Sequence, residues 1–241
     1  MPAYCRPVAY DAFLDELPRL ETTPGLFRAA FAISLHELPT ASIDEAEATI
    51  AGLADTVNHR VQSPNADARL AHLHDVLFEL VGVTGNVEDY YNPANSYLPE
   101  VLRAHRGLPI TLALVYKCVA ERVGLAACGI NSPGHFLAAV KPGASSTTDG
   151  HSAAWMYVDP FYGGQLLNEA DVGRRIAETT GQEAVDLAQW LEPTSHKQWL
   201  ARMLNNLQAT FARSGRERDH YAMLELYELL TKQVQRGKME A

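Results

Sequence analysis

A histidine and an aspartate at the ends of two short apolar runs are the residues of this chain best suited to chemistry. His135 follows the turn pair Pro133-Gly134 and opens the run "HFLAAV", while Asp159 lies near the end of the run "AWMYVDPF". A histidine at a strand start is often structural, and Asp-Pro commonly ends a strand. However, an imidazole can take up a proton, and a carboxylate on the next strand can fix its tautomer. The two residues together predict a hydrogen-bonded pair.

The start of a buried helix is the place where such a pair would need its nucleophile. Pro109 stands where a first helical residue is expected, and Ile110 to Val123 form a nearly continuous apolar run, which predicts a helix inside the domain. A thiolate at a helix N-terminus is favoured by the helix dipole, and a histidine beside it can take its proton. Along the chain the buried helix comes first, then the strand expected to carry the histidine, and then the strand with the aspartate. This order resembles that of papain-like and transglutaminase-like enzymes.

Four segments together carry a resemblance to a known family. In chain order they are "NPANSYLPEVLRAHRGLPITLALVY", "SPGHFLAAV", "VDPFYGG" and "LARMLNNLQATF". This set resembles the bacterial SirB-type branch of the transglutaminase-like superfamily, over about residues 25 to 235. The resemblance implies an α+β fold with a transglutaminase-like (papain-like) core, in which a buried helix packs against a small antiparallel sheet. It also implies flanking helices and a tetratricopeptide-like helical tail.

The chain departs from the family at the position of the nucleophile. With Gly124 as the reference point, the family's cysteine position falls on Pro109, which has no nucleophilic atom. His135 and Asp159 match the other two members of the triad. The side chains that remain as possible nucleophiles are Thr111, Ser96 and Cys128.

Local roles are the alternative for each of these three side chains. Serine and threonine hydroxyls such as those of Ser96 and Thr111 commonly cap helices or bond to nearby backbone. An apolar strand around Cys128 would raise the pKa of its thiol and leave it inert. We therefore favour a transglutaminase-like domain that lacks the usual nucleophile and serves as a binding or regulatory protein. The alternative is an amide hydrolase or acyltransferase in which His135 is the base and Asp159 orients it.

Several further side chains near the predicted helix start are candidates for ligand binding. Asn95 and Arg106 are polar positions of the family type, and either binds a ligand carboxylate or holds the turn. Phe161, with Tyr90 and Tyr91, lines a cleft or belongs to the core.

The pattern of elements divides the chain into three parts. Helical periodicity predicts an N-terminal helical section over residues 1–90, with a capping box of Ser42 and Glu45 opening one helix. Residues 91–170 are expected to form the transglutaminase-like core. Residues 171–241 are expected to form a helical tail with one tetratricopeptide-like helix hairpin, in which Leu200 faces Tyr221.

Within the core, a short helix precedes the buried one, and strands follow it. Asn95-Ser96 is predicted to cap the short helix, and Arg106-Gly107 to end it. An exposed loop, "KPGASSTTDGHS", is predicted between the second and third strands. The predicted strands lie in "AACGIN", "HFLAAV", "AWMYVDPF" and "GGQLL".

Composition excludes several classes of function. A formal net charge of -9 disfavours nucleic-acid binding, which needs a basic face. The chain has no apolar run of about 18 residues and no secretory leader pattern, so we expect a cytoplasmic protein without membrane contact. Three scattered cysteines and the pair His72 and His74, two residues apart, predict no disulfide, metal or cofactor. From Lys197 onward basic residues outnumber acidic ones, so the C-terminal helices are a candidate surface for a protein partner.

Overall fold

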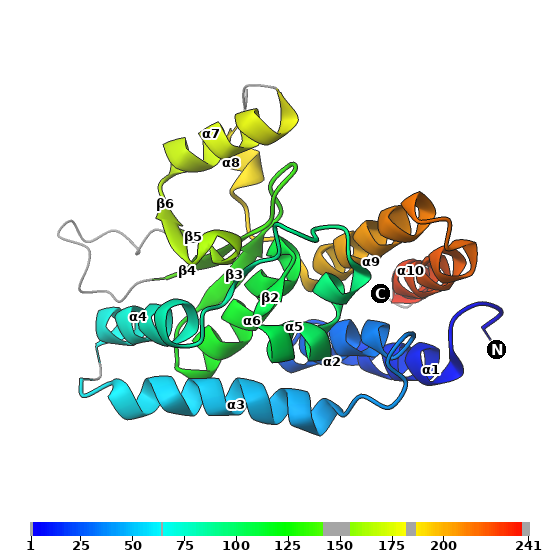
Figure 1. Ribbon diagram of the computed structural model, residues 1–241, viewed down its shortest axis with the longest axis horizontal. Coiled ribbons are helices and arrows are strands. Elements are labelled where there is room, and N and C mark those ends of the chain that lie inside the picture. Colours follow the sequence, from blue (N-terminus) through cyan, green and yellow to red (C-terminus); the bar gives the residue numbers. More distant parts are fainter. Residues whose placement is uncertain (1, 64, 142–154, 182–186, 238–241) are drawn as a thin grey trace.

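A small antiparallel sheet and one buried helix form the centre of the computed structural model, which describes residues 2–63, 65–141, 155–181 and 187–237 (Figure 1). The sheet has the strand order β3-β4-β5-β6, and each strand runs antiparallel to its neighbours. All four predicted strands are confirmed. They are β3 (Ala127–Ile130), β4 (Leu137–Val140), β5 (Met156–Asp159) and β6 (Gln165–Leu167). Apart from Lys141, the predicted exposed loop lies outside the described residues.

The two faces of the sheet pack against different helices. Ala138 and Val158 belong to the main core, which is built around α6 (Pro109–Arg122), a helix buried from its first residue to Ala120. The alternating residues of the same strands, such as Leu137, pack instead with the buried side of α7 (Glu169–Thr180). In Figure 1, α7 and α8 (Leu187–Trp190) lie on the opposite side of the sheet from α3. This arrangement confirms the expected α+β fold.

The N-terminal helices form layers beyond α6, and their starts are capped as the sequence suggests. Ser42 accepts a hydrogen bond from the backbone N–H of Glu45, and Asn65 accepts one from Asp67. The helix that begins at Ala66 changes to a π-helix at Asp75, which the sequence pattern did not indicate. The helices are α1 (Pro7–Glu16), the 3-10 turn η1 (Leu17–Arg19), α2 (Thr23–Ser34), α3 (Ile43–Arg60), α4 (Ala66–His74) and the π-helix η2 (Asp75–Leu80).

A histidine at the end of α4 fixes this helix to the central one. The Nε2 atom of His74 lies 2.9 Å from the hydroxyl of Tyr116 on α6, and the ring of Phe78 stacks on Tyr116. Burial lowers the pKa of His74 from 6.5 to about 4. His74 is thus a neutral hydrogen-bonding partner of the core. Among the residues that the structure describes, no group of three or more potential ligands could hold a metal ion.

The segment that leads into α6 differs in detail from the prediction. Asn95 and Ser96 lie inside a 3-10 turn, η3 (Pro93–Ser96), whose cap is Asn92, so they do not cap the following helix. That helix, α5 (Leu98–Ala104), ends at His105 in the left-handed conformation, with φ of 55°. It ends before the predicted Arg106-Gly107 because these two residues form β2 (Arg106–Gly107), which pairs in parallel with β1 (Thr84–Gly85).

The C-terminal helices, α9 (His196–Arg213) and α10 (Glu217–Gly237), dock on the body of the same chain. The Trp199 side chain is fully buried, and its Nε1 donates to the carbonyl of Ile110 in α6 at 3.2 Å. The ring lies 2.3 Å from the place where a Cβ on Gly129 would be, so β3 admits only glycine there. Just before α9, the N–H of Thr194 donates to the carbonyl of Gly129 at 2.9 Å, and Pro193 bridges to Ile130.

The contact residues of α10 agree only in part with the prediction, which placed Tyr221, Leu224 and Leu230 against α9. Tyr221 is 43% exposed, and the buried face of this helix consists of Ala222, Met223, Leu226 and Leu230. Of the predicted residues on α10, only Leu230 is fully buried. No helix in the described part of the chain is long and apolar enough to span a membrane.

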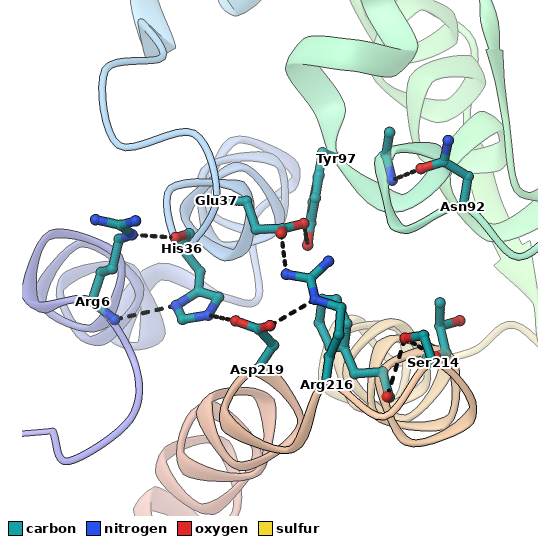
Figure 2. Close-up of polar contacts among 11 residues, drawn as sticks. Arg6, His36, Glu37, Asn92, Tyr97, Ser214, Arg216 and Asp219 are labelled. Carbon is teal, nitrogen blue, oxygen red and sulfur yellow. Dashed lines mark hydrogen bonds and ion pairs between the residues drawn. The ribbon is translucent and has the colours of Figure 1, made fainter.

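A polar cluster ties the start of α10 to the N-terminal helices (Figure 2). His36 accepts a hydrogen bond from the backbone N–H of Arg6 at Nδ1, so its Nε2 carries the proton that Asp219 accepts at 2.9 Å. Arg216 Nε donates to Asp219 Oδ2 at 2.7 Å, and Arg216 Nη2 donates to the carboxylate of Glu37, which follows α2. The cluster and the buried Trp199 make the helix pair an integral part of the packed structure.

Candidate functional site

A turn and a strand end bring His135 and Asp159 together. Gly134, with φ of 71°, completes the turn before His135, and Asp159 is the last residue of β5. His135 Nε2 lies 2.9 Å from Asp159 Oδ2; the His135 side chain is about one-tenth exposed and that of Asp159 is completely buried. Because an ionised carboxylate only accepts hydrogen bonds, Nε2 carries the proton. In the neutral imidazole, Nδ1 then keeps its lone pair.

Asp159 accepts three hydrogen bonds from described residues, and one of them comes from an arginine on α7. Arg175 Nη1 lies 2.6 Å from Asp159 Oδ2, and the backbone N–H of Phe161 donates to Oδ1 at 3.1 Å. The guanidinium also lies over the ring of Tyr162, 4.4 Å from its centre. Arg175 thus compensates a fully buried negative charge that the imidazole alone would not neutralise.

Sequence reasoning missed Arg175, although a signal for it existed. The residue lies one position before Ile176 and three after Val172, and these two form the buried face of α7. Side chains three or four residues apart share a helix face. A charged residue beside an apolar stripe is therefore a candidate partner for a buried acid.

The start of α6 is close to two of the three candidate nucleophiles in sequence, but in the described structure neither forms a hydrogen bond with the imidazole of His135. Pro109 is the first residue of the helix, and Thr111, two residues on, is buried with a hydroxyl that has no hydrogen-bond partner among the described residues. Ser96 is buried at the end of η3. Within the described ranges, no hydroxyl or thiol forms a hydrogen bond with the imidazole of His135.

The third candidate, Cys128, lies away from the histidine along the sheet. Cys128 pairs with Ala139 in β4, whereas His135 precedes the first residue of that strand. The four residues from His135 to Ala139 correspond to roughly 13 Å of extended chain. Burial raises the pKa of the Cys128 thiol to about 12, an effect that nearby Lys117 only partly offsets. The structure therefore does not bring this thiol to the imidazole.

The candidate binding residues Asn95 and Arg106 have different environments. The Asn95 side chain is buried; its Nδ2 donates to the carbonyls of Asp89 at 2.7 Å and Tyr90 at 3.2 Å, and its Oδ1 accepts from Asn86. Its amide is thus used within the protein, where it positions the loop that carries Tyr90. Arg106 is exposed and lies 4.0 Å from a carboxylate oxygen of Glu88.

Phe161 belongs to a group of aromatic rings that extends from His135 to the protein surface. Its ring centre is 6.0 Å from that of His135 and 5.8 Å from that of Tyr90, and Tyr91 lies 5.3 Å beyond Tyr90. The Tyr162 ring is also 6.0 Å from the imidazole. Tyr91 and Tyr162 are each more than half exposed. We call Tyr90, Tyr91, Phe161 and Tyr162 the aromatic surface.

β4 begins at Leu137, so His135 lies two residues before the strand that it was expected to start. A buried helix packed on an antiparallel sheet, with this histidine paired to an aspartate at the end of the neighbouring strand, defines a transglutaminase-like domain. The sequence profile of the transglutaminase-like superfamily matches residues 44–205, and the chain belongs to this superfamily. A UPF0162 protein of Xylella fastidiosa (strain 9a5c) is 32% identical over 200 residues, which cover 81% of this chain and 68% of that protein.

Two further relatives show that the similarity extends beyond one group of bacteria. A UPF0162 protein of Pseudomonas aeruginosa is 28% identical over 195 residues, covering 80% of this chain and 67% of that protein. F-box only protein 21 of Mus musculus is 31% identical over 155 residues, which are 63% of this chain but only 24% of that much longer protein. No solved structure matches the chain significantly.

Proposed function

We propose that this protein is a SirB-type member of the superfamily that binds a ligand at His135 without forming a covalent intermediate, as a binding or regulatory protein. The observation that carries the proposal is Pro109 at the first position of α6. A proline there satisfies the helix start, but it supplies neither a thiol nor a hydroxyl. Because the pair of His135 and Asp159 is kept, the site can still hold a ligand.

The state of the imidazole supports a binding role. Asp159 and Arg175 fix the orientation of His135, and its Nδ1 atom is left as an acceptor beside the exposed ring of Tyr162. A ligand N–H or O–H group can donate to this nitrogen while its apolar part contacts the aromatic surface. Such recognition requires no nucleophile.

The alternative is an amide hydrolase or acyltransferase, and one observation favours it. The Thr111 hydroxyl is completely buried near the start of α6 and lacks a hydrogen-bond partner in the described part of the chain. A buried hydroxyl without a partner costs free energy and is a common feature of functional sites. In this alternative Thr111, with Ser96 as the second candidate, attacks an amide carbonyl after His135 removes the hydroxyl proton, and the C–N bond breaks as the amine leaves with that proton. Cys128, the third candidate of the sequence, lies too far along the sheet for this role.

We also propose the division of the chain into residues 1–90, 91–170 and 171–241, and a protein-binding role for the C-terminal helices. The exposed ring of Tyr221, which lies 5.0 Å from that of Tyr4, supports a contact surface on α10. A cytoplasmic location is part of the same proposal.

The experiment that separates binding from catalysis measures turnover of amide peptides. The wild-type protein is incubated with glutamine-containing peptides and a labelled amine, and hydrolysis, deamidation and transamidation are followed by mass spectrometry. We expect no turnover. Turnover that disappears in His135→Ala, and persists in the matched variant His59→Ala, would establish the enzyme. His59 is a suitable control because it is an exposed histidine bonded only to its own helix, at the carbonyl of Asp55.

A further inference from the structure

An arginine of α9 holds the loop that leads to His135. Arg202 Nη1 donates to the carbonyl of Ser132 at 2.7 Å and to the side-chain oxygen of Asn131. Both acceptors lie between β3 and His135, so the C-terminal helix pair reaches the candidate site through this side chain. The arginine lies in the segment "LARMLNNLQATF", for which the sequence suggested no chemical role.

The charge of Arg202 is not compensated within the described structure. The side chain is half-buried, and burial lowers its pKa. Its two acceptors are neutral, and no carboxylate among the described residues lies within 4.0 Å of its guanidinium nitrogens. A guanidinium has five N–H donors, and a planar carboxylate fits two of them at once. Arg202 therefore has the chemistry to bind an anion from outside the chain.

The aromatic surface lies beside this cation. Burial raises the pKa of Tyr90, the nearby charge of Arg202 partly offsets this effect, and Tyr91 and Tyr162 add to it. The guanidinium of Arg202 lies 5.7 Å from the ring centre of Phe136, which follows His135 in the chain, and the His135 ring lies 6.0 Å from the rings of Phe161 and Tyr162. These contacts join the cation, the exposed rings and the imidazole in one continuous region.

A second cation extends the region at its outer end. The guanidinium of Arg213 lies 3.8 Å from the ring centre of Tyr91, and it is exposed without an ion pair in the described ranges. The acids nearest in sequence, Glu88 and Asp89, face other partners: Glu88 lies 4.0 Å from Arg106, and Asp89 accepts from an asparagine. Arg202 and Arg213 thus lie on α9 at the two ends of the aromatic surface, each without a carboxylate partner in the described structure.

We propose that Arg202, Arg213 and the aromatic surface bind an extended acidic peptide segment of a partner protein, with one of its carboxylates on Arg202. Charge complementarity selects an acidic partner, and the exposed tyrosine rings select a segment with apolar or aromatic residues between its acids. The proposal rests on the proposed binding role of the His135 site and adds the chemical class of its ligand.

The test compares two peptides that differ only in charge. Peptide one is Gly-Phe-Glu-Phe-Glu-Gly with an uncharged label and an amidated C-terminus; peptide two has glutamine at both glutamate positions. Binding to the wild-type protein is measured by fluorescence anisotropy. We expect the glutamate peptide to bind about tenfold more tightly or better, since charge-assisted hydrogen bonds contribute more than neutral ones. The preference should shrink when the salt concentration is raised.

Single substitutions show which arginines cause the preference for the glutamate peptide. In Arg202→Gln the preference for glutamate should fall about tenfold, in Arg213→Gln by a smaller factor, and in Arg202→Lys it should be partly kept. Arg218→Gln is the matched control, because Arg218 is an exposed arginine on α10 without an ion pair in the described structure, and its loss should change the preference less than twofold. Thermal unfolding of each variant shows whether the loop of Asn131 and Ser132 still folds.

The outcomes separate this inference from the proposed function. Equal binding of the two peptides, no binding of either, or equal effects of Arg202→Gln and Arg218→Gln would overturn the acidic-peptide site. If Arg202→Gln does not fold, the salt-sensitive preference of the wild type and the behaviour of Arg202→Lys and Arg213→Gln decide the question. Mass spectrometry of the peptides after incubation tests the proposed function separately, because turnover contradicts it whether or not glutamate is preferred.

Discussion

Lowering the pH from 7 to 5 should destabilise this protein through one histidine, His74. Burial lowers the pKa of His74 to about 4 in the folded protein, whereas in the unfolded chain it is near its ordinary value of 6.5. Between these two values the unfolded chain binds more protons than the folded one. Stability is therefore lost as the pH falls through 6.5 toward 4, and above 6.5 this loss is absent.

The size of the effect follows from the difference between the two pKa values. Each pKa unit corresponds to about 1.4 kcal/mol, so the full loss, reached below pH 4, is about 3 kcal/mol. At pH 5 the same linkage gives a loss of about 2 kcal/mol in the free energy of unfolding. This is a large part of the stability of an ordinary domain.

The assay is urea denaturation of the wild type and of His74→Gln at several pH values from 5 to 8. Glutamine removes the titration but can still accept a hydrogen bond from the Tyr116 hydroxyl, which is otherwise buried without a partner. Other groups that titrate in this range, such as His196, are present in both proteins and cancel in the comparison. The reasoning is refuted if the two proteins lose equal stability between pH 7 and pH 5.

Further predictions concern the packing and the candidate site. Trp199→Ala should lower the free energy of unfolding by about 3–5 kcal/mol, and Trp199→Phe by clearly less, in denaturant titrations; similar values for both would contradict the packing role of the indole. Arg175→Met should cost about 3 kcal/mol because it leaves the Asp159 carboxylate buried without its cation, and adding Asp159→Asn should recover part of that loss. Alkylation of Cys128 by iodoacetamide should be slow at pH 7.5 and rise steeply with pH, as followed by intact mass spectrometry, because its pKa is about 12. In Pro109→Cys the new thiol at the helix start should react faster than Cys128; equal rates would argue against a helix-start effect.

The sequence indicated the central elements because their signals are local. The apolar run after Pro109 could only be a buried helix, and the turn before His135 and the Asp-Pro pair at Asp159 marked strand ends. Helix starts at Ser42 and Asn65 were likewise encoded by single capping residues. Signals of this kind act over a few positions and are visible without a structure.

The contacts between distant segments could not be predicted in the same way. Arg175 reaches Asp159 across 16 positions, Arg202 reaches Ser132 across 70, and Trp199 reaches Ile110 across 89. Which face of a helix meets which loop depends on packing of the whole chain, and no short pattern records it. The misassigned contact of Tyr221 has the same cause.

The chain just before α9 also protects the sheet from self-association. β3 is an outer strand of the sheet, and such a strand presents unpaired backbone groups on which another chain can form a strand pair. Here the N–H of Thr194 donates a hydrogen bond to the carbonyl of Gly129, and Pro193, which has no N–H, lies opposite Ile130. A fragment that ended before Pro193 would uncover this edge, and aggregation of such a fragment would follow from the exposed strand itself.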